Sequence, residues 1–108
     1  MSLKENRMNN IERIETKELR GRILAVLDYN YPVGLSEKLV LQSLVAARFD
    51  VTRRELKAQL AYLSEKGYVT LQQVGFADID LARQMVKLTV SGKDLVDGNI
   101  DPDPGVSA

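Results

Sequence analysis

Three basic residues close together in the sequence are the best placed to make chemical contacts. Arg53, Arg54 and Lys57 stand at the start of a segment with helical spacing, and Ala58 and Ala61 follow on the same arc. In such a helix an arginine can donate two hydrogen bonds to guanine, a lysine can pair with phosphate, and alanine lets the backbone approach the major groove. The pattern could therefore form a surface for duplex DNA. Taken alone, it favours an ordinary solvated helix face, because lysine and arginine are helix formers that any bundle would accept.

A second segment with an unusual mixture of side chains is "VGFADIDLAR", residues 74–83. Its apolar residues Phe76, Ile79 and Leu81 could fold back onto the domain's own core, or form an exposed patch that a second subunit or another protein buries. Asp78 and Asp80 would then form a polar rim. A divalent cation site is the weakest interpretation, because two alternating aspartates fall far short of a calcium loop.

The residue types needed for most catalytic sites are absent. The chain contains no histidine and no cysteine, which excludes disulfides, thiolate zinc sites and His- or Cys-based nucleophile systems. No glycine-rich phosphate loop is found, and Glu12, Glu15 and Glu18 are spaced like a solvated helix face with Arg13 and Lys17 between them. We therefore predict that the protein is not an enzyme and binds no metal or cofactor.

The charge distribution is uneven although the formal net charge is zero. Residues 16–66 carry nine Lys or Arg against six Asp or Glu, whereas residues 67–108 carry three against six. This gives faint support to a nucleic-acid partner and leaves a protein partner open. No signal peptide or membrane-spanning run is found in the sequence, which predicts a soluble, cytoplasmic protein without a membrane partner.

The apolar spacing of the first third predicts a core helix over residues 16–29, ending at the turn formers of "DYNYPVG". Ile11 and Ile14 do not continue its apolar stripe. Residues 1–15 are therefore expected to form an N-terminal arm or an extra helix. The two isoleucines either complete the domain's own core or form a dimer arm.

Two further helices are predicted from their capping residues. Ser36 is a good N-cap for a helix that runs to about Arg48, and apolar residues on both of its faces predict that neighbours surround it on most sides. The next helix starts with the capping box "TRRE", in which Thr52 and Glu55 cap each other's backbone amides, and it ends at Gly67. Its core face is formed by Leu56, Leu60 and Leu63.

The last third changes to a period of two residues. "YVTLQQV" and "QMVKLT" are expected to form two antiparallel strands of a hairpin, connected by residues 75–83. A short helix capped by Thr89 and stopped by Gly98 follows. The tail at residues 99–108, rich in Pro and Asp, is predicted to be disordered.

The order of these elements resembles a winged helix-turn-helix domain. "LAYLSEKGYV" and "VKLTVSGKDLVDG" are similar to the recognition-helix end, wing and closing segment of bacterial MarR-like and PadR-like regulators, over about residues 18–98. "VTRRELKAQLAYLSEKGYV" also resembles small winged-helix proteins of Mu-like prophages. The resemblance implies an α+β, mainly helical fold at residues 16–98, with a three-helix core, a two-stranded wing and a short C-terminal helix.

The same resemblance implies double-stranded DNA as the partner, with the third helix in the major groove. Thr52 joins the three basic residues at the positions that would meet DNA, and Arg83 and Lys87 would assist from the wing. The acidic tip departs from this pattern, because carboxylates repel phosphate. We therefore predict a DNA-binding regulator or accessory factor of a bacterium or prophage. The alternative is a winged-helix interaction module that does not bind DNA, with a homodimer or protein interface at Ile11, Ile14, Phe76, Ile79 and Leu81.

Overall fold

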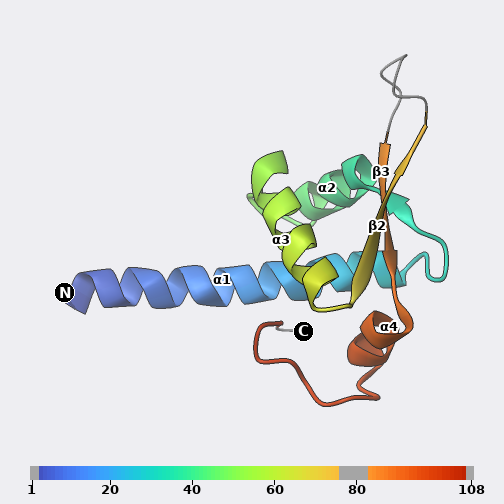
Figure 1. Cartoon of the computed structure of the whole chain (residues 1–108). Helices are drawn as coiled ribbons and strands as arrows, with labels where there is room; N and C mark the ends of the chain where they lie inside the picture. Colours follow the sequence, from blue (N-terminus) through green and yellow to red (C-terminus); the bar gives the residue numbers. More distant parts are fainter. Residues whose placement is uncertain (1–2, 76–82, 107–108) are drawn as a thin grey trace.

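A computed structural model of the protein describes residues 3–75 and 83–106, with side chains from residue 13 onward. Four helices and a three-stranded antiparallel sheet of order β1-β3-β2 make up the described part of the chain (Figure 1). In chain order the elements are α1 (Leu3–Asp28), β1 (Leu35–Ser36), α2 (Glu37–Ala46), α3 (Arg53–Glu65), β2 (Val69–Val74), β3 (Arg83–Leu88) and α4 (Val90–Asp97).

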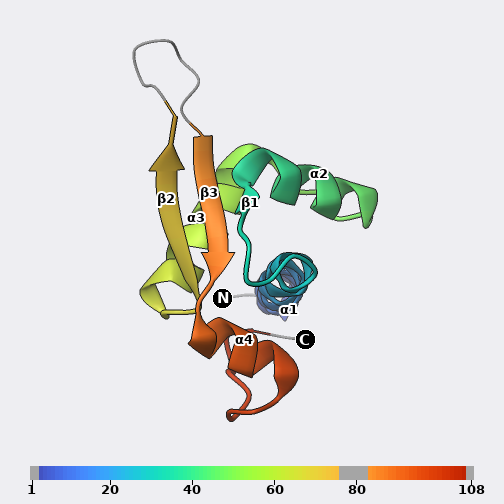
Figure 2. The ribbon, with the colours of Figure 1, turned by 90° about the vertical axis from the view of Figure 1, so that its right-hand side faces the viewer.

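Helix α1 lies in the middle of the molecule. The helices α2 and α3 lie on one side of it, and α4 and the C-terminal segment lie on the other, while the hairpin of β2 and β3 runs past α1 toward α4 (Figures 1 and 2). One continuous core joins all elements except β1 and α4, which contribute partly buried residues at its edge. Its buried apolar residues are Ile23, Leu24, Leu27, Val40, Leu44, Val51, Leu56, Leu60, Leu63, Val69, Val86 and Leu88.

The predicted start of the first helix near residue 16 is wrong, because α1 is one continuous helix from Leu3 to Asp28. Its N-terminal half projects away from the rest of the molecule (Figure 1). Ile14 is 56% exposed, so it does not complete the domain's own core. The side chain of Ile11 lies outside the described part, and the dimer arm stays a prediction.

Helix α2 is less enclosed than its sequence predicts. Val40 and Leu44, one helical turn apart, are fully buried, but Leu39 and Val45 are about half exposed. Only one narrow face of α2 therefore packs against α1 and the sheet. The expectation that neighbours surround this helix on most sides is wrong, because apolar character on a second face does not by itself provide a partner for that face.

The capping residues are confirmed. Ser36 Oγ accepts the amide of Leu39 (3.2 Å), the reciprocal bonds of the capping box at Thr52 and Glu55 are both present, and Thr89 Oγ1 accepts the amide of Gly92 (3.0 Å). The third helix ends before Gly67, whose φ of 82° lies in the left-handed region that glycine adopts readily.

The sheet has a third strand that the sequence does not reveal. Leu35 and Ser36 pair with Val86 and Met85 of β3, while β2 pairs with β3 along its whole length. The wing is thus confirmed as a hairpin and extended by β1. Its tip, residues 76–82, lies outside the described residues, and so do the three interpretations of Phe76, Asp78, Ile79, Asp80 and Leu81.

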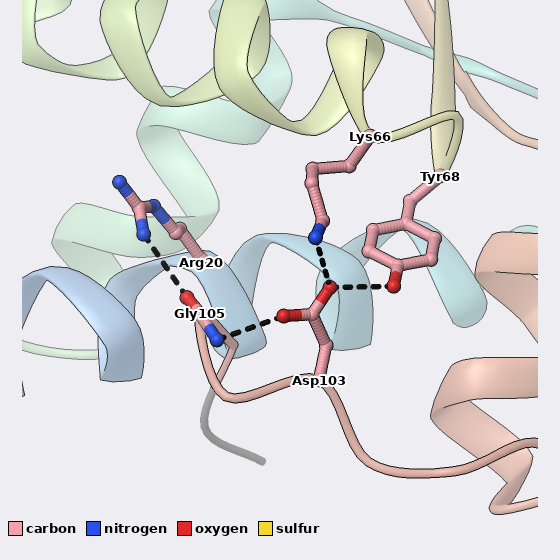
Figure 3. A network of polar contacts seen from close by, with 5 residues as sticks. All are labelled: Arg20, Lys66, Tyr68, Asp103 and Gly105. Atoms are coloured by element: carbon pink, nitrogen blue, oxygen red, sulfur yellow. Dashed lines mark hydrogen bonds and ion pairs between the residues drawn. The ribbon is translucent and has the colours of Figure 1, made fainter.

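The predicted disorder of residues 99–108 is wrong as far as Val106, because the segment after α4 packs against the domain. Val106 contacts the core, and Arg20 Nη1 of α1 donates a hydrogen bond to the carbonyl oxygen of Gly105 (3.1 Å; Figure 3). The same guanidinium donates from Nε to Gln59 of α3 (2.7 Å) and stacks on Tyr62. One arginine therefore connects α1, α3 and the C-terminal segment.

Asp103 is the main anchor of this segment (Figure 3). Its Oδ2 accepts a hydrogen bond from the Tyr68 hydroxyl (2.6 Å) and pairs with Lys66 Nζ (2.9 Å), and its Oδ1 accepts the amide of Gly105 (2.8 Å). These contacts, led by the Tyr68 hydrogen bond, lower the pKa of Asp103 from 3.8 to about 2. The hydrogen bond to Asp103 in turn raises the pKa of both Lys66 and Tyr68. Composition alone suggests that Asp103 is solvated. In the structure its carboxylate instead fixes the C-terminal segment to the domain.

We expect Asp103→Asn to lower the free energy of unfolding by about 1–2 kcal/mol at neutral pH, because a neutral amide cannot pair with Lys66. A carboxyl whose folded pKa is depressed contributes stability above its unfolded pKa and loses it as the pH falls through the folded one. The difference between the parent and the variant should therefore shrink between about pH 4 and about pH 2. Urea unfolding followed by circular dichroism at several pH values measures it.

The matched control is Asp101→Asn, the same substitution at an exposed carboxylate two residues earlier. This variant should unfold like the parent at every pH. Equal stability of the parent and Asp103→Asn at neutral pH would mean that the anchor contributes nothing.

Gly92 allows α4 to pack closely against the start of β2. A Cβ at this position would lie far inside the van der Waals contact distance of the Tyr68 carbonyl oxygen and 3.0 Å from Leu88 Cδ2. That carbonyl accepts the amide of Thr89 (3.0 Å), so the backbone there cannot move without losing a hydrogen bond. The glycine of the "LTVSG" segment is thus required by packing.

We expect Gly92→Ala to lower the free energy of unfolding by about 1–3 kcal/mol through overpacking. Ser91→Ala, at the exposed neighbouring position, should change it by less than about 0.5 kcal/mol. Thermal and urea unfolding compare the two variants. If Gly92→Ala unfolds like Ser91→Ala, the close contact does not limit stability.

Candidate nucleic-acid interface

An open groove of about 1000 Å³ lies between α2, α3 and the hairpin. Its walls are the first turns of α2 and α3 and the part of the hairpin near its tip. Three separate segments of the chain therefore line one surface. The residues along it are Ser36, Glu37, Lys38, Leu39, Leu41, Gln42, Arg53, Lys57, Gln73, Arg83 and Gln84.

The groove is positively charged although the whole chain is neutral. Four of its lining residues are cationic, namely Lys38 of α2, Arg53 and Lys57 of α3 and Arg83 of β3, against the single carboxylate of Glu37. The four cations come from three elements, and all four are exposed. Such a concentration raises the local density of anions and attracts a polyanion.

Three predicted DNA-binding residues, Arg53, Lys57 and Arg83, thus lie together in the groove. Arg54, Ala58 and Ala61 are exposed on α3 but do not line the groove. By helical spacing they lie on the outer face of α3, beside Lys57. Together with Lys57 they form a surface that runs from the first turn of this helix to its third.

Lys87 is placed differently from the other predicted residues. Its neighbours Val86 and Leu88 are buried in the core, and successive strand residues point to opposite faces of the sheet. Lys87 therefore lies on the face of β3 away from the core. Arg83 has the same parity, but it stands at the tip end of the strand, where it lines the groove, whereas Lys87 does not. Arg83 is the wing cation that the groove includes.

Thr52 caps α3 with its hydroxyl oxygen, and its hydroxyl proton remains available for a further hydrogen bond. Its Oγ1 accepts the amide of Glu55 (3.1 Å), while the carboxylate of Glu55 accepts the amide of Thr52 (3.2 Å). Since the hydroxyl oxygen serves as the acceptor in the cap, its O–H can still donate, for instance to a phosphate oxygen. Thr52 is exposed at the start of α3, beside Arg53.

The groove also contains residues that sequence reasoning missed. Lys38 and Gln42 lie one turn apart on α2, and Gln73 and Gln84 are paired across the hairpin. The signal for Gln73 was its place in the alternating strand pattern, at the same parity as Val69 and Leu71. Nothing in the sequence identified Lys38, because it lines the groove only as a result of the position of α2 beside the hairpin.

Glu37 is the other residue that sequence reasoning missed. It is only 6% exposed, and its Oε1 lies 3.6 Å from Nε of Arg53. Among the described residues, no donor makes a hydrogen bond to this oxygen. The first residues of α2 and α3 are therefore connected by an ion pair at the floor of the groove.

Comparisons with known proteins place the fold. No family model and no curated protein matches the sequence. The arrangement of elements is similar to that in the crystal structure of Bacillus subtilis PadR in complex with operator DNA, with a TM-score of 0.60 and 22% sequence identity over 80% of this chain. The fold is a winged helix-turn-helix. The likeness covers 49% of the PadR chain, so this winged-helix domain corresponds to about half of that protein.

This comparison confirms the predicted fold class, α+β and mainly helical. The PadR-like part of the resemblance is thereby supported at the level of fold, and the prophage likeness stays a prediction. Within residues 3–75 and 83–106, no helix has the length and apolar character needed to cross a membrane. The same residues contain no cluster of acidic side chains arranged to hold a metal ion.

We expect Thr52→Ala to lower the free energy of unfolding by about 1 kcal/mol, because it removes one half of the capping box. Thr52→Ser keeps an accepting hydroxyl and should unfold within about 0.5 kcal/mol of the parent. Chemical unfolding of both variants provides the measurement. Similar losses in the two would show that the hydroxyl is not the stabilising group.

Proposed function

We propose that the protein binds double-stranded DNA through the groove and the exposed face of α3. The observation that carries the proposal is the convergence of Lys38, Arg53, Lys57 and Arg83, from three elements, in one groove of a neutral chain. Phosphate contacts by lysine and arginine supply most of the non-specific affinity for duplex DNA. PadR, whose structure shares this fold, is bound to operator DNA in that crystal structure.

The groove also has groups suited to base edges and the sugar-phosphate backbone. The amides of Gln42, Gln73 and Gln84 can both donate and accept hydrogen bonds. Leu39, about half exposed on the groove wall, offers an apolar contact of the kind that a thymine methyl group makes. In this proposal α3 enters the major groove and β3 contacts the backbone.

The biological role we infer is that of a transcriptional regulator or accessory factor, of bacterial or prophage origin, that acts without catalysis and in the cytoplasm. The alternative hypothesis, an interaction module that does not bind DNA, depends mainly on residues 76–82, outside the described part. No described feature favours it over the DNA hypothesis. A homodimer through the projecting half of α1 also stays a prediction.

The direct test is fluorescence anisotropy of a labelled mixed-sequence duplex titrated with the protein at low and raised salt. Non-specific binding should appear with a Kd of about 10⁻⁴ to 10⁻⁶ M and weaken steeply as salt rises. Absence of binding at low salt would reject the DNA hypothesis and leave the interaction module.

We expect Arg54→Ala with Lys57→Ala to weaken binding by roughly tenfold or more and to reduce the salt slope by about 2, since two phosphate contacts are lost. The control, Arg13→Ala with Lys17→Ala, removes the same charge from α1, away from the groove. This control should retain the slope of the parent. Equal effects of the two double variants would assign binding to net charge and not to α3.

A further inference from the structure

The ion pair between Glu37 and Arg53 is unusual in its combination of burial and exposure. The Glu37 side chain is 8% exposed, whereas the Arg53 side chain is 75% exposed. The distance of 3.6 Å between Oε1 and Nε is that of an ionic attraction without a hydrogen bond. Among residues 13–75 and 83–106, Glu37 is thus the carboxylate that pairs with Arg53 in the groove.

Stabilisation of α2 does not explain this placement. A glutamate in the first turn of a helix interacts favourably with the helix dipole, but an exposed glutamate does so equally well. Burial of a carboxylate with an oxygen that accepts no hydrogen bond costs stability. The placement of this carboxylate beside an exposed arginine in the groove therefore points to a role in binding.

The contact with Glu37 involves one nitrogen of the Arg53 guanidinium. Its Nε lies 3.6 Å from Oε1 of Glu37, and the Arg53 side chain as a whole is 75% exposed. Arginine reads guanine with two donors directed at O6 and N7. A buried carboxylate beside Nε biases the arginine toward one orientation before it meets a base, and the two terminal nitrogens can still act as donors.

We propose that Glu37 is a positioning residue that holds Arg53 to read a guanine in duplex DNA. This inference rests on the proposed function and adds a base preference to it. The other groove cations, Lys38, Lys57 and Arg83, then supply phosphate contacts that carry no sequence information. Arg53 differs from them because it has a fixed acidic partner on a neighbouring helix.

The test is selection of bound duplexes from a library with a randomised central segment, followed by sequencing, for the parent and three variants. Glu37→Gln removes the charge that attracts Nε. Arg53→Lys keeps the positive charge but lacks the planar pair of donors. Glu65→Gln, at an exposed position near the end of α3, makes the same change of charge outside the groove and is the matched control.

The parent and Glu65→Gln should enrich a guanine at one position, with a preference on the order of tenfold to a hundredfold over the other bases. Glu37→Gln and Arg53→Lys should lower this preference to about threefold or less. Anisotropy with the mixed-sequence duplex should show that Glu37→Gln binds as tightly as the parent or more tightly, because it removes a negative charge from the groove. A variant that had unfolded would instead lose both affinity and preference.

Two results would overturn the inference while leaving the proposed function intact. They are DNA binding by the parent without enrichment of guanine, and enrichment that survives in Glu37→Gln. If Glu37→Gln fails to fold, as judged by circular dichroism, Glu37→Asp decides the outcome, because it keeps the carboxylate but withdraws it from Nε by one methylene; an unchanged guanine preference in that variant would overturn the positioning role. Failure of the parent to bind any duplex would reject the proposed function itself.

Discussion

The pairing of two residues, Leu35 and Ser36, with β3 determines where the walls of the groove stand. Ser36 is at once the last residue of β1, opposite Met85, and the N-cap of α2. The first turn of α2 therefore begins at the edge of the sheet, with no linker that could move it. Gly34 permits this arrangement, because a Cβ there would lie 2.8 Å from the Val86 carbonyl oxygen. A larger residue at position 34 would push β1 away from β3 and so move the start of α2 away from the hairpin.

The parts of the fold that the sequence predicted are those with local causes. The capping box at Thr52, the cap at Ser36 and the left-handed glycine at 67 each act within one turn of chain, and all are found where the pattern placed them. The two strands of the hairpin were predictable for the same kind of local reason. Apolar residues stand two positions apart in each strand, Val69 and Leu71 in the first and Val86 and Leu88 in the second. Three predicted contact residues, Arg53, Lys57 and Arg83, meet in one groove because these local elements are correct.

The features that the sequence did not predict depend on contacts between distant segments. β1 is two residues long, too short for any periodic signal, and it exists because β3 offers it an edge. The pairing of Glu37 with Arg53 requires the first turns of α2 and α3 to be known in three dimensions. Composition suggested a disordered tail, since many Asp and Pro residues usually indicate solvation, but Asp103 has partners 35 and 37 positions earlier in the sequence.

The hydrogen bond between Arg20 and Gly105 joins residues 85 positions apart, almost the whole length of the described chain. A contact of such separation closes a very long loop, and its entropic cost is met only after the segments between have already assembled. The surface that receives Gly105 is itself a product of folding, since Arg20 is held there by Gln59 and Tyr62 of α3. Because this surface exists only once α1 and α3 are packed together, docking of the C-terminal segment depends on the fold of the rest of the domain.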